Sequence, residues 1–179
     1  MPTVLVLLAD GFEEIEALAP VDLLRRAGIE VTVASLNENR HATGRSGITA
    51  HADAALSAVQ ARDFDLVFLP GGAGVNNLRA DPRVREIVRR QHTAGRWLAA
   101  ICAAPTVLHD AGLLAGRRYT AHFSVATELP AILAGERIVT DGRITTSRGA
   151  GTAVEFGLHL VALLCSAEKA AEISKAICL

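Results

Sequence analysis

The sequence predicts an α/β fold, a doubly wound three-layer sandwich in which helices cover both faces of a mostly parallel central sheet. Short apolar runs alternate along the chain with longer segments of helical periodicity. The run Val4–Ala9, for example, is apolar at nearly every position, as is typical of a strand that is covered by helices on both sides. In such folds ligands bind beyond the carboxyl ends of the strands, so the residues that follow the strands are the candidates for function.

The N-terminal two thirds of the chain contain most of the expected elements. The predicted strands are Val4–Ala9, Ile29–Leu36, Asp65–Pro70 and Trp97–Ile101, and the predicted helices are Glu13–Ala27, Pro82–Ala94 and Ala103–Leu114. Pro20 is expected to kink or restart the first helix, because proline lacks the amide hydrogen that the helix ladder needs. The segment Gly47–Asp53 is expected to add a small hairpin strand at the sheet edge.

The C-terminal third is expected to contain one hairpin and one broken helix. Asp141-Gly142 separates two β-rich runs within Arg137–Ser147, which is a strong hairpin signal. Thr152–Ile177 has helical character with a break near Ser166. Because no linker, repeat or low-complexity tract interrupts the pattern, residues 1–179 are expected to form one domain.

Composition excludes several classes of protein. Half of the residues are apolar, 21% are charged and the net charge is −1, which indicates a soluble globular domain rather than a nucleic-acid binder. The longest apolar run, Trp97–Ala104, falls well short of the ~18 residues that a membrane span needs. No basic region precedes the first strand, so no signal peptide is expected. Three cysteines without metal-type spacing favour reduced thiols in the cytoplasm, and no metal site is expected.

Cys102 is the principal candidate for chemistry. It lies in AICAAP, where a buried strand turns into a helix, and this placement resembles a nucleophile elbow with the small residues Ala100 and Ala104 around it. Amides at the helix N-terminus would favour the thiolate and lower the pKa of the thiol. An inert buried thiol is the alternative interpretation. Packing or exposure accounts for Cys165 and Cys178.

Other polar groups are expected near the same sheet edge. The first strand ends in ADGFEEIEA, where Glu13 and Glu16 share a helix face. We expect the end of this strand to lie beside that of the elbow strand, which makes contact between a glutamate and Cys102 plausible; alternatively, these acids only complement the helix dipole. The glycine turn LPGGAG could direct amides at an oxyanion, His122 follows a predicted strand, and Arg148 in SRGAGT could meet an anion. A structural histidine and a surface arginine are the alternatives for the last two.

Four motifs in this order and spacing resemble the ThiJ/PfpI family: ADGFEEIEA, LPGGAG, AICAAPTVL and SRGAGT. The resemblance extends over essentially the whole chain. It is closest to the short branch of the family, which contains the parkinsonism-associated protein deglycase and bacterial relatives. The resemblance implies a flavodoxin-like fold, a homodimer, no required cofactor, and a reactive Cys102 hydrogen-bonded to a protonated Glu16. Motif matching assigns His122 as a proton carrier. It also assigns the oxyanion- or substrate-binding groups, which are Gly71, Gly72, Ala103 and Arg148.

Two departures from the family pattern bear on function. Ala103 stands where the peptidase and larger chaperone branches carry histidine, which disfavours a cysteine peptidase. The glycine turn is one residue shorter than in the nearest relatives. The leading hypothesis is a cofactor-independent glyoxalase, with related deglycase activity, that acts on small α-oxoaldehydes such as methylglyoxal. The alternative is a redox-sensing, stress-protective and chaperone-like binding protein whose Cys102 is oxidised to sulfinate. The first helix, with Arg25 and Arg26, is the expected dimer contact.

Overall fold

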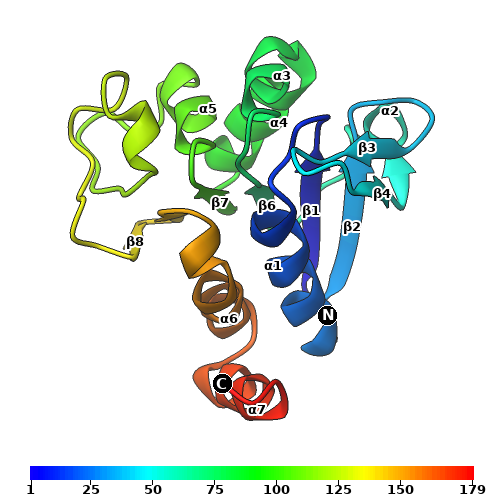
Figure 1. Ribbon diagram of the computed structural model, residues 1–179, viewed down its shortest axis with the longest axis vertical. Helices are drawn as coiled ribbons and strands as arrows, with labels where there is room; N and C mark the ends of the chain where they lie inside the picture. The colour runs from blue at the N-terminus through cyan, green and yellow to red at the C-terminus, as the bar shows by residue number, and fades with distance from the viewer.

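The computed structural model describes residues 1–179, which form one seven-stranded sheet covered on both faces by helices (Figure 1). Its strands are β1 Thr3–Leu8, β2 Glu30–Ser35, β5 Ala54–Ala55, β6 Leu66–Leu69, β7 Trp97–Ile101, β8 Ile138–Asp141 and β9 Ile144–Ser147. They are ordered β5-β2-β1-β6-β7-β9-β8, and every neighbouring pair is parallel except β8 and β9. This arrangement confirms the flavodoxin-like α/β fold.

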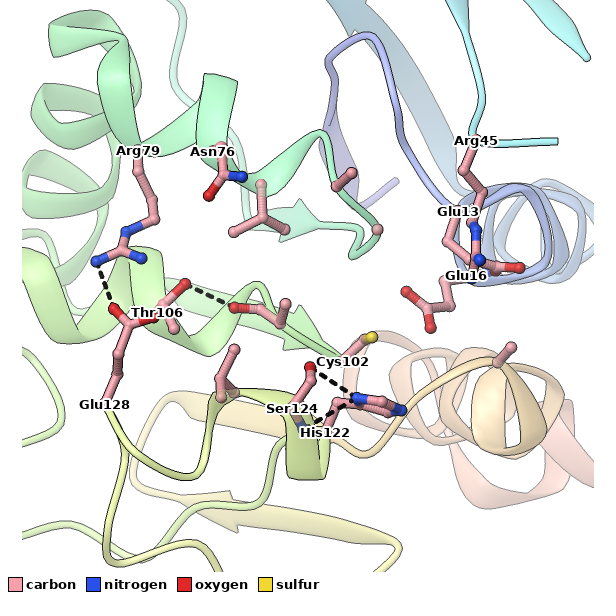
Figure 2. Close-up of a pocket in the computed structure, with 16 residues that line it drawn as sticks. Glu13, Glu16, Arg45, Asn76, Arg79, Cys102, Thr106, His122, Ser124 and Glu128 are labelled. Atoms are coloured by element: carbon pink, nitrogen blue, oxygen red, sulfur yellow. Dashed lines mark hydrogen bonds and ion pairs between the residues drawn. The ribbon is translucent and has the colours of Figure 1, made fainter. Parts of the chain in front are cut away.

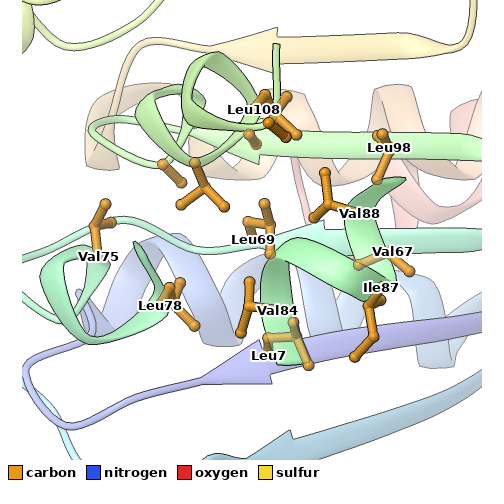
Figure 3. Packing of buried hydrophobic residues seen from close by; sticks show 14 of the residues in the cluster. Leu7, Val67, Leu69, Val75, Leu78, Val84, Ile87, Val88, Leu98 and Leu108 are labelled. Carbon is orange, nitrogen blue, oxygen red and sulfur yellow. The ribbon is translucent and has the colours of Figure 1, made fainter. Parts of the chain in front are cut away.

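Two hydrophobic cores lie on the two faces of the sheet because side chains alternate along each strand. In β1, Val4, Val6 and Leu8 belong to one core, and Leu5 and Leu7 belong to the other. The helices are α1 Glu14–Arg26, α2 Leu56–Val59, α3 Val75–Ala80, α4 Pro82–Thr93, α5 Pro105–Asp110, α6 Ala153–Leu164 and α7 Ala167–Ala176. Helices α1, α6 and α7 cover the first core, and α2 to α5 cover the second, part of which is drawn in Figure 3. The central strands β1, β6 and β7 are therefore apolar at almost every position.

Most of the predicted elements agree with the structure to within a few residues. Pro20 lies inside an unbroken α1, so the predicted restart is wrong, and the predicted kink stays a prediction. Helix α1 packs closely on α6 at this point, where a Cβ on Gly157 would lie 2.9 Å from Cα of Pro20. The hairpin is present with Asp141 paired to Ile144, and the C-terminal helices divide at Ser166, whose side chain caps α7.

Three predictions about local structure are corrected, and one helix was missed. The segment Gly47–Asp53 does form a hairpin, but β4 Thr49–His51 pairs with β3 His41–Thr43 in a separate two-stranded sheet, and the edge strands of the main sheet are β5 and β8. Helix α5 is shorter than predicted because Gly112, with φ +79°, ends the segment early. Helix α3 was not predicted. The residues before His122 form no strand, although they return the chain to the sheet edge.

None of the helices is both long enough and apolar enough to cross a membrane.

Candidate active site

Cys102 occupies a strained turn between β7 and α5. Its φ is +65°, in the left-handed region that non-glycine residues rarely adopt. Two backbone hydrogen bonds hold it there: the Cys102 amide donates to the Ser147 carbonyl at 2.9 Å, and the His122 amide donates to the Cys102 carbonyl at 2.8 Å. Ala100 and Ala104 are fully buried on either side. The structure thus has the predicted nucleophile elbow, and it holds the side chain at the carboxyl end of the sheet.

Glu16 lies in the first turn of α1 and is buried, with 2% of its surface exposed. The Glu13 side chain begins this helix, because its Oε2 accepts a hydrogen bond from the Glu16 amide at 2.7 Å. The Glu16 carboxyl points towards the Cys102 sulfur (Figure 2). Its Oε2 is buried without a hydrogen-bond partner. Because an ionised oxygen is costly to bury without donors, this atom is a favourable position for a proton.

The contact between Glu16 and Cys102 depends on a glycine between them. The prediction that β1 ends beside the elbow strand is wrong, since β6 lies between β1 and β7. Gly71 follows β6, and a Cβ there would lie 2.5 Å from Cβ of Cys102 and 2.9 Å from the Ile101 carbonyl, and would overlap Oε2 of Glu16. Glu16 therefore reaches Cys102 across the end of β6 because residue 71 has no side chain.

The second glycine of the turn, Gly72, holds its backbone amide beside the Cys102 sulfur. Gly72 has φ +91° and pairs with Phe12 in an isolated antiparallel bridge, and the adjacent Gly71 carbonyl accepts from the Glu13 amide at 3.0 Å. The amides of Gly72 and Ala103 face the Cys102 sulfur and act to lower its pKa. The Gly71 amide acts instead on Glu16. Of the predicted oxyanion-binding groups, Gly72 and Ala103 thus have amides that act on the cysteine, and Gly71 has one that acts on Glu16; the oxyanion role itself stays a prediction.

Burial shifts both ionisable groups of the pair. It raises the pKa of Glu16 from 4.5 to about 7, and the charge of Glu13 adds to this effect. Burial and the negative charge of Glu16 raise the pKa of the Cys102 thiol to about 12, so the predicted lowering is not found. Protonation of Glu16 removes that charge and supplies a donor to the sulfur. The two groups therefore titrate as a unit, in which Glu16 ionises first and near neutral pH.

His122 lines the same cavity, and Ser124 on the same loop orients its imidazole ring. Its Nδ1 accepts from the Ser124 amide at 3.2 Å and lies 2.8 Å from the Ser124 hydroxyl. The neutral ring therefore carries its proton on Nε2. Arg148 is exposed and lies outside the cysteine cavity, in an adjoining hollow that also borders His122. The structure thus brings Glu16, Gly72, Ala103 and His122 around Cys102, and does not bring Arg148 to the cavity.

The cavity has a volume of about 480 Å³ and extends well beyond the cysteine. Its polar lining includes side chains that sequence reasoning missed: Arg45, Asn76, Arg79, Thr106, Ser124 and Glu128. These residues come from four separate segments, and no local pattern marks them. Arg79 is held by ion pairs to Asp110 at 2.7 Å and Glu128 at 2.8 Å, whereas no ion pair engages Arg45. The chain has no cluster of three or more histidine, cysteine or acidic side chains with metal-binding geometry.

The fold and the site together define a flavodoxin-like protein with a cysteine nucleophile elbow and a buried glutamate partner. The family model described as the DJ-1/PfpI family matches residues 2–163. The chain belongs to this family, which confirms the resemblance inferred from the motifs.

Named relatives match nearly the whole chain. Protein dj-1beta of Drosophila melanogaster is 40% identical over 177 residues, which are 97% of this chain and 95% of the fly protein. The Parkinson disease protein 7 homolog of Danio rerio is 39% identical over 178 residues, covering 94% of this chain and 93% of the fish protein. A Caenorhabditis elegans relative named glutathione-independent glyoxalase DJR-1.2 is 34% identical over 178 residues, covering 98% and 95%.

Solved structures agree with these matches. The crystal structure of Drosophila melanogaster DJ-1beta superposes with a TM-score of 0.96 at 38% identity, and covers 99% of this chain and 98% of the fly chain. Oxidised Toxoplasma gondii DJ-1 gives a TM-score of 0.94 at 33% identity, with the same coverage. The family thus includes a protein named as a glyoxalase, which indicates enzymatic activity in some members.

Proposed function

We propose that this protein is a cofactor-independent glyoxalase that converts small α-oxoaldehydes, such as methylglyoxal, to hydroxy acids at Cys102. The proposal is carried by one observation, the buried Glu16 carboxyl directed at the cysteine sulfur with its pKa raised to about 7. A general acid–base group works best when its pKa is near the operating pH, because both of its protonation states are then populated. The relative named as a glyoxalase supports this choice.

The first chemical step forms a bond between the Cys102 sulfur and the aldehyde carbon. Because burial raises the pKa of the thiol, ionised Glu16 removes its proton as the sulfur attacks. The aldehyde oxygen gains the electron pair of the carbonyl bond and is stabilised by the amides of Gly72 and Ala103. Glu16 then returns the proton to this oxygen, which gives a neutral hemithioacetal.

The second step is an isomerisation that Glu16 can perform without a cofactor. Glu16 removes the hydrogen of the former aldehyde carbon as a proton, which gives an enediolate, and delivers that proton to the neighbouring carbon, while the hydroxyl proton of the first carbon passes to the oxygen of the second. The product is a thioester of the hydroxy acid. Water attacks this thioester, the carbon–sulfur bond breaks, and Cys102 recovers its proton as lactate leaves. In neutral His122 the protonated Nε2 is available to donate to a substrate oxygen.

The test is lactate production from methylglyoxal in an amine-free buffer. The wild-type protein should produce lactate, and Cys102→Ser should produce none. Glu16→Gln keeps a hydrogen-bond donor beside the sulfur but cannot accept a proton, so it should lose most turnover. Wild-type turnover in Glu16→Gln would remove Glu16 from the mechanism. Release of lactate from glycated amines would extend the activity to a deglycase.

Redox sensing is the second candidate function, and the same amides favour it. A sulfinate on Cys102 would place its oxygens near Gly72, Ala103 and the Glu16 carboxyl, all of which can donate hydrogen bonds to an anion. Peptide mass spectrometry after peroxide treatment tests this function. A gain of two oxygens at Cys102 in a protein that makes no lactate would favour the sensor over the enzyme.

We also propose that the protein is a cytoplasmic homodimer that contacts its partner through α1 and binds neither nucleic acid nor membrane. Helix α1 exposes the large apolar side chains Ile15 and Leu18, with 54% and 40% of their surface accessible. Apolar side chains grouped on one helix are typical of a protein interface. Light scattering tests this proposal, and a monomer at high micromolar concentration would contradict it.

A further inference from the structure

A pair of exposed histidines lies on the small hairpin, outside the cysteine cavity. His41 in β3 and His51 in β4 are directly opposite each other in the antiparallel register. The Ala52 amide donates to the Arg40 carbonyl at 2.8 Å, which makes the histidines a non-hydrogen-bonded pair. Side chains approach most closely at such positions. Neither histidine lines the cavity around Cys102.

The two imidazoles face each other through like atoms. The Nδ1 atoms are 3.4 Å apart, and the ring centroids are 4.8 Å apart with an angle of 59° between the planes. The Nδ1 atoms make no other hydrogen bonds, and 3.4 Å is long for a hydrogen bond between ring nitrogens. When both rings are neutral and protonated on Nε2, two lone pairs are directed into the same space. A cation placed between them would remove this repulsion and use both as ligands.

The separation of the nitrogens matches a tetrahedral ion. Zinc–imidazole bonds of about 2.0–2.1 Å at a tetrahedral angle place the two nitrogens about 3.3–3.4 Å apart. The observed distance between the Nδ1 atoms is 3.4 Å. Two cis ligands of a square-planar ion at the same bond length would be only about 2.9 Å apart. The spacing therefore favours Zn²⁺ over ions that prefer right angles between ligands.

We propose that His41 and His51 form a surface binding site for Zn²⁺ in which the two Nδ1 atoms are the protein ligands and water completes the tetrahedron. The acidic residue that follows β4, Asp53, is engaged by Arg25 at 2.6 Å and by the Val33 amide at 2.8 Å. The site therefore has two protein ligands. This proposal does not depend on the proposed glyoxalase function.

The position of the site gives bound zinc a structural role. The turn between β3 and β4 carries Arg45 into the cysteine cavity. The hairpin is held to the loop after β1 by the Gly11 amide, which donates to the Thr43 carbonyl at 2.7 Å, and by Asp10, which accepts from the Thr43 amide at 2.9 Å. Since an isolated two-stranded hairpin is only marginally stable, a metal bridge between its strands would stabilise the segment that positions Arg45.

Calorimetric titration with zinc chloride tests the site. The full-length protein should carry Cys165→Ser and Cys178→Ser, because exposed thiols also bind zinc. We expect one saturable site whose affinity falls at least tenfold in His41→Asn and equally in His51→Asn. His109→Asn is the matched control, an exposed histidine on α5 that should leave the titration unchanged. Equal zinc binding by all four proteins would overturn the proposal.

Nuclear magnetic resonance of the imidazole nitrogens provides a second readout that needs no substitution in the hairpin. Zinc should shift the Nδ1 resonances of His41 and His51 together and saturate at one equivalent for that site. Resonances that do not move, or that move only for other histidines, would show that the pair forms a simple hydrogen bond and would refute the zinc site.

Discussion

Replacement of Glu16 by glutamine should change how the stability of the protein depends on pH. Burial raises the pKa of Glu16 from 4.5 to about 7, so the folded protein binds a proton more tightly than the unfolded chain does. The folded state is therefore favoured below pH 4.5, and this contribution is lost as pH rises through 7. A shift of this size corresponds to about 3 kcal/mol in the free energy of unfolding. The side chain is 2% exposed, so solvent screening is small.

The difference in unfolding free energy between Glu16→Gln and wild type isolates this contribution. Glutamine does not ionise, so the variant should gain about 3 kcal/mol relative to wild type between pH 4.5 and pH 8.5. Cys102 adds little over this range, because the pKa of its thiol is about 12 in the folded protein and its ordinary value of 9.0 also lies above pH 8.5. The predicted change of about 3 kcal/mol is the change with pH in the difference between the unfolding free energies of the two proteins. Any cost of the glutamine amide that does not depend on pH therefore cancels.

Urea unfolding at fixed protein concentration and several pH values measures this difference. Glu86→Gln, on the exposed side of α4, is the matched control and should keep the pH dependence of wild type. Parallel curves for wild type and Glu16→Gln from pH 4.5 to 8.5 would refute the argument that burial keeps Glu16 protonated. The lactate assay on the same variant then separates the ionisation of Glu16 from its role in turnover.

Three further outcomes follow from the geometry. Gly71→Ala should destabilise the fold by about 1–3 kcal/mol and reduce turnover at least tenfold, because its Cβ would press on Cys102 and Glu16. Gly135→Ala is the control: its Cβ meets nothing within 4 Å, so it should match wild type in urea unfolding and activity. Cys102→Gly should be about 1 kcal/mol more stable than Cys102→Ala, since glycine tolerates φ +65°, and equal stability would argue against strain at the elbow. Gln91→Leu should cost about 1–3 kcal/mol in thermal or urea unfolding, because the buried Gln91 amide donates to the carbonyls of Phe64 at 2.9 Å and Trp97 at 3.2 Å; an unchanged midpoint would contradict this.

The local sequence determined most of the elements and the class of fold. Val4–Ala9 is apolar at every strand position because both faces of β1 are covered, and Asp141-Gly142 marks the hairpin because glycine adopts φ +60° there. The elbow at Cys102 was also predictable, since a strand-to-helix turn with small neighbours is a local feature. The motifs around it were specific enough to indicate the family.

Tertiary structure alone decided how the site is assembled. Sequence placed Glu16 and Cys102 at one sheet edge but not β6 between them, so it could not show that Gly71 provides the space for their contact. The pKa of Cys102 depends on burial and on the charge of Glu16, which outweigh the helix amides that a local argument considers. Arg45 and Arg79 reach the cavity from separate segments, and His41 meets His51 only through strand register. Such contacts between distant residues arise from chain packing, because no periodicity within a segment encodes which segments become neighbours.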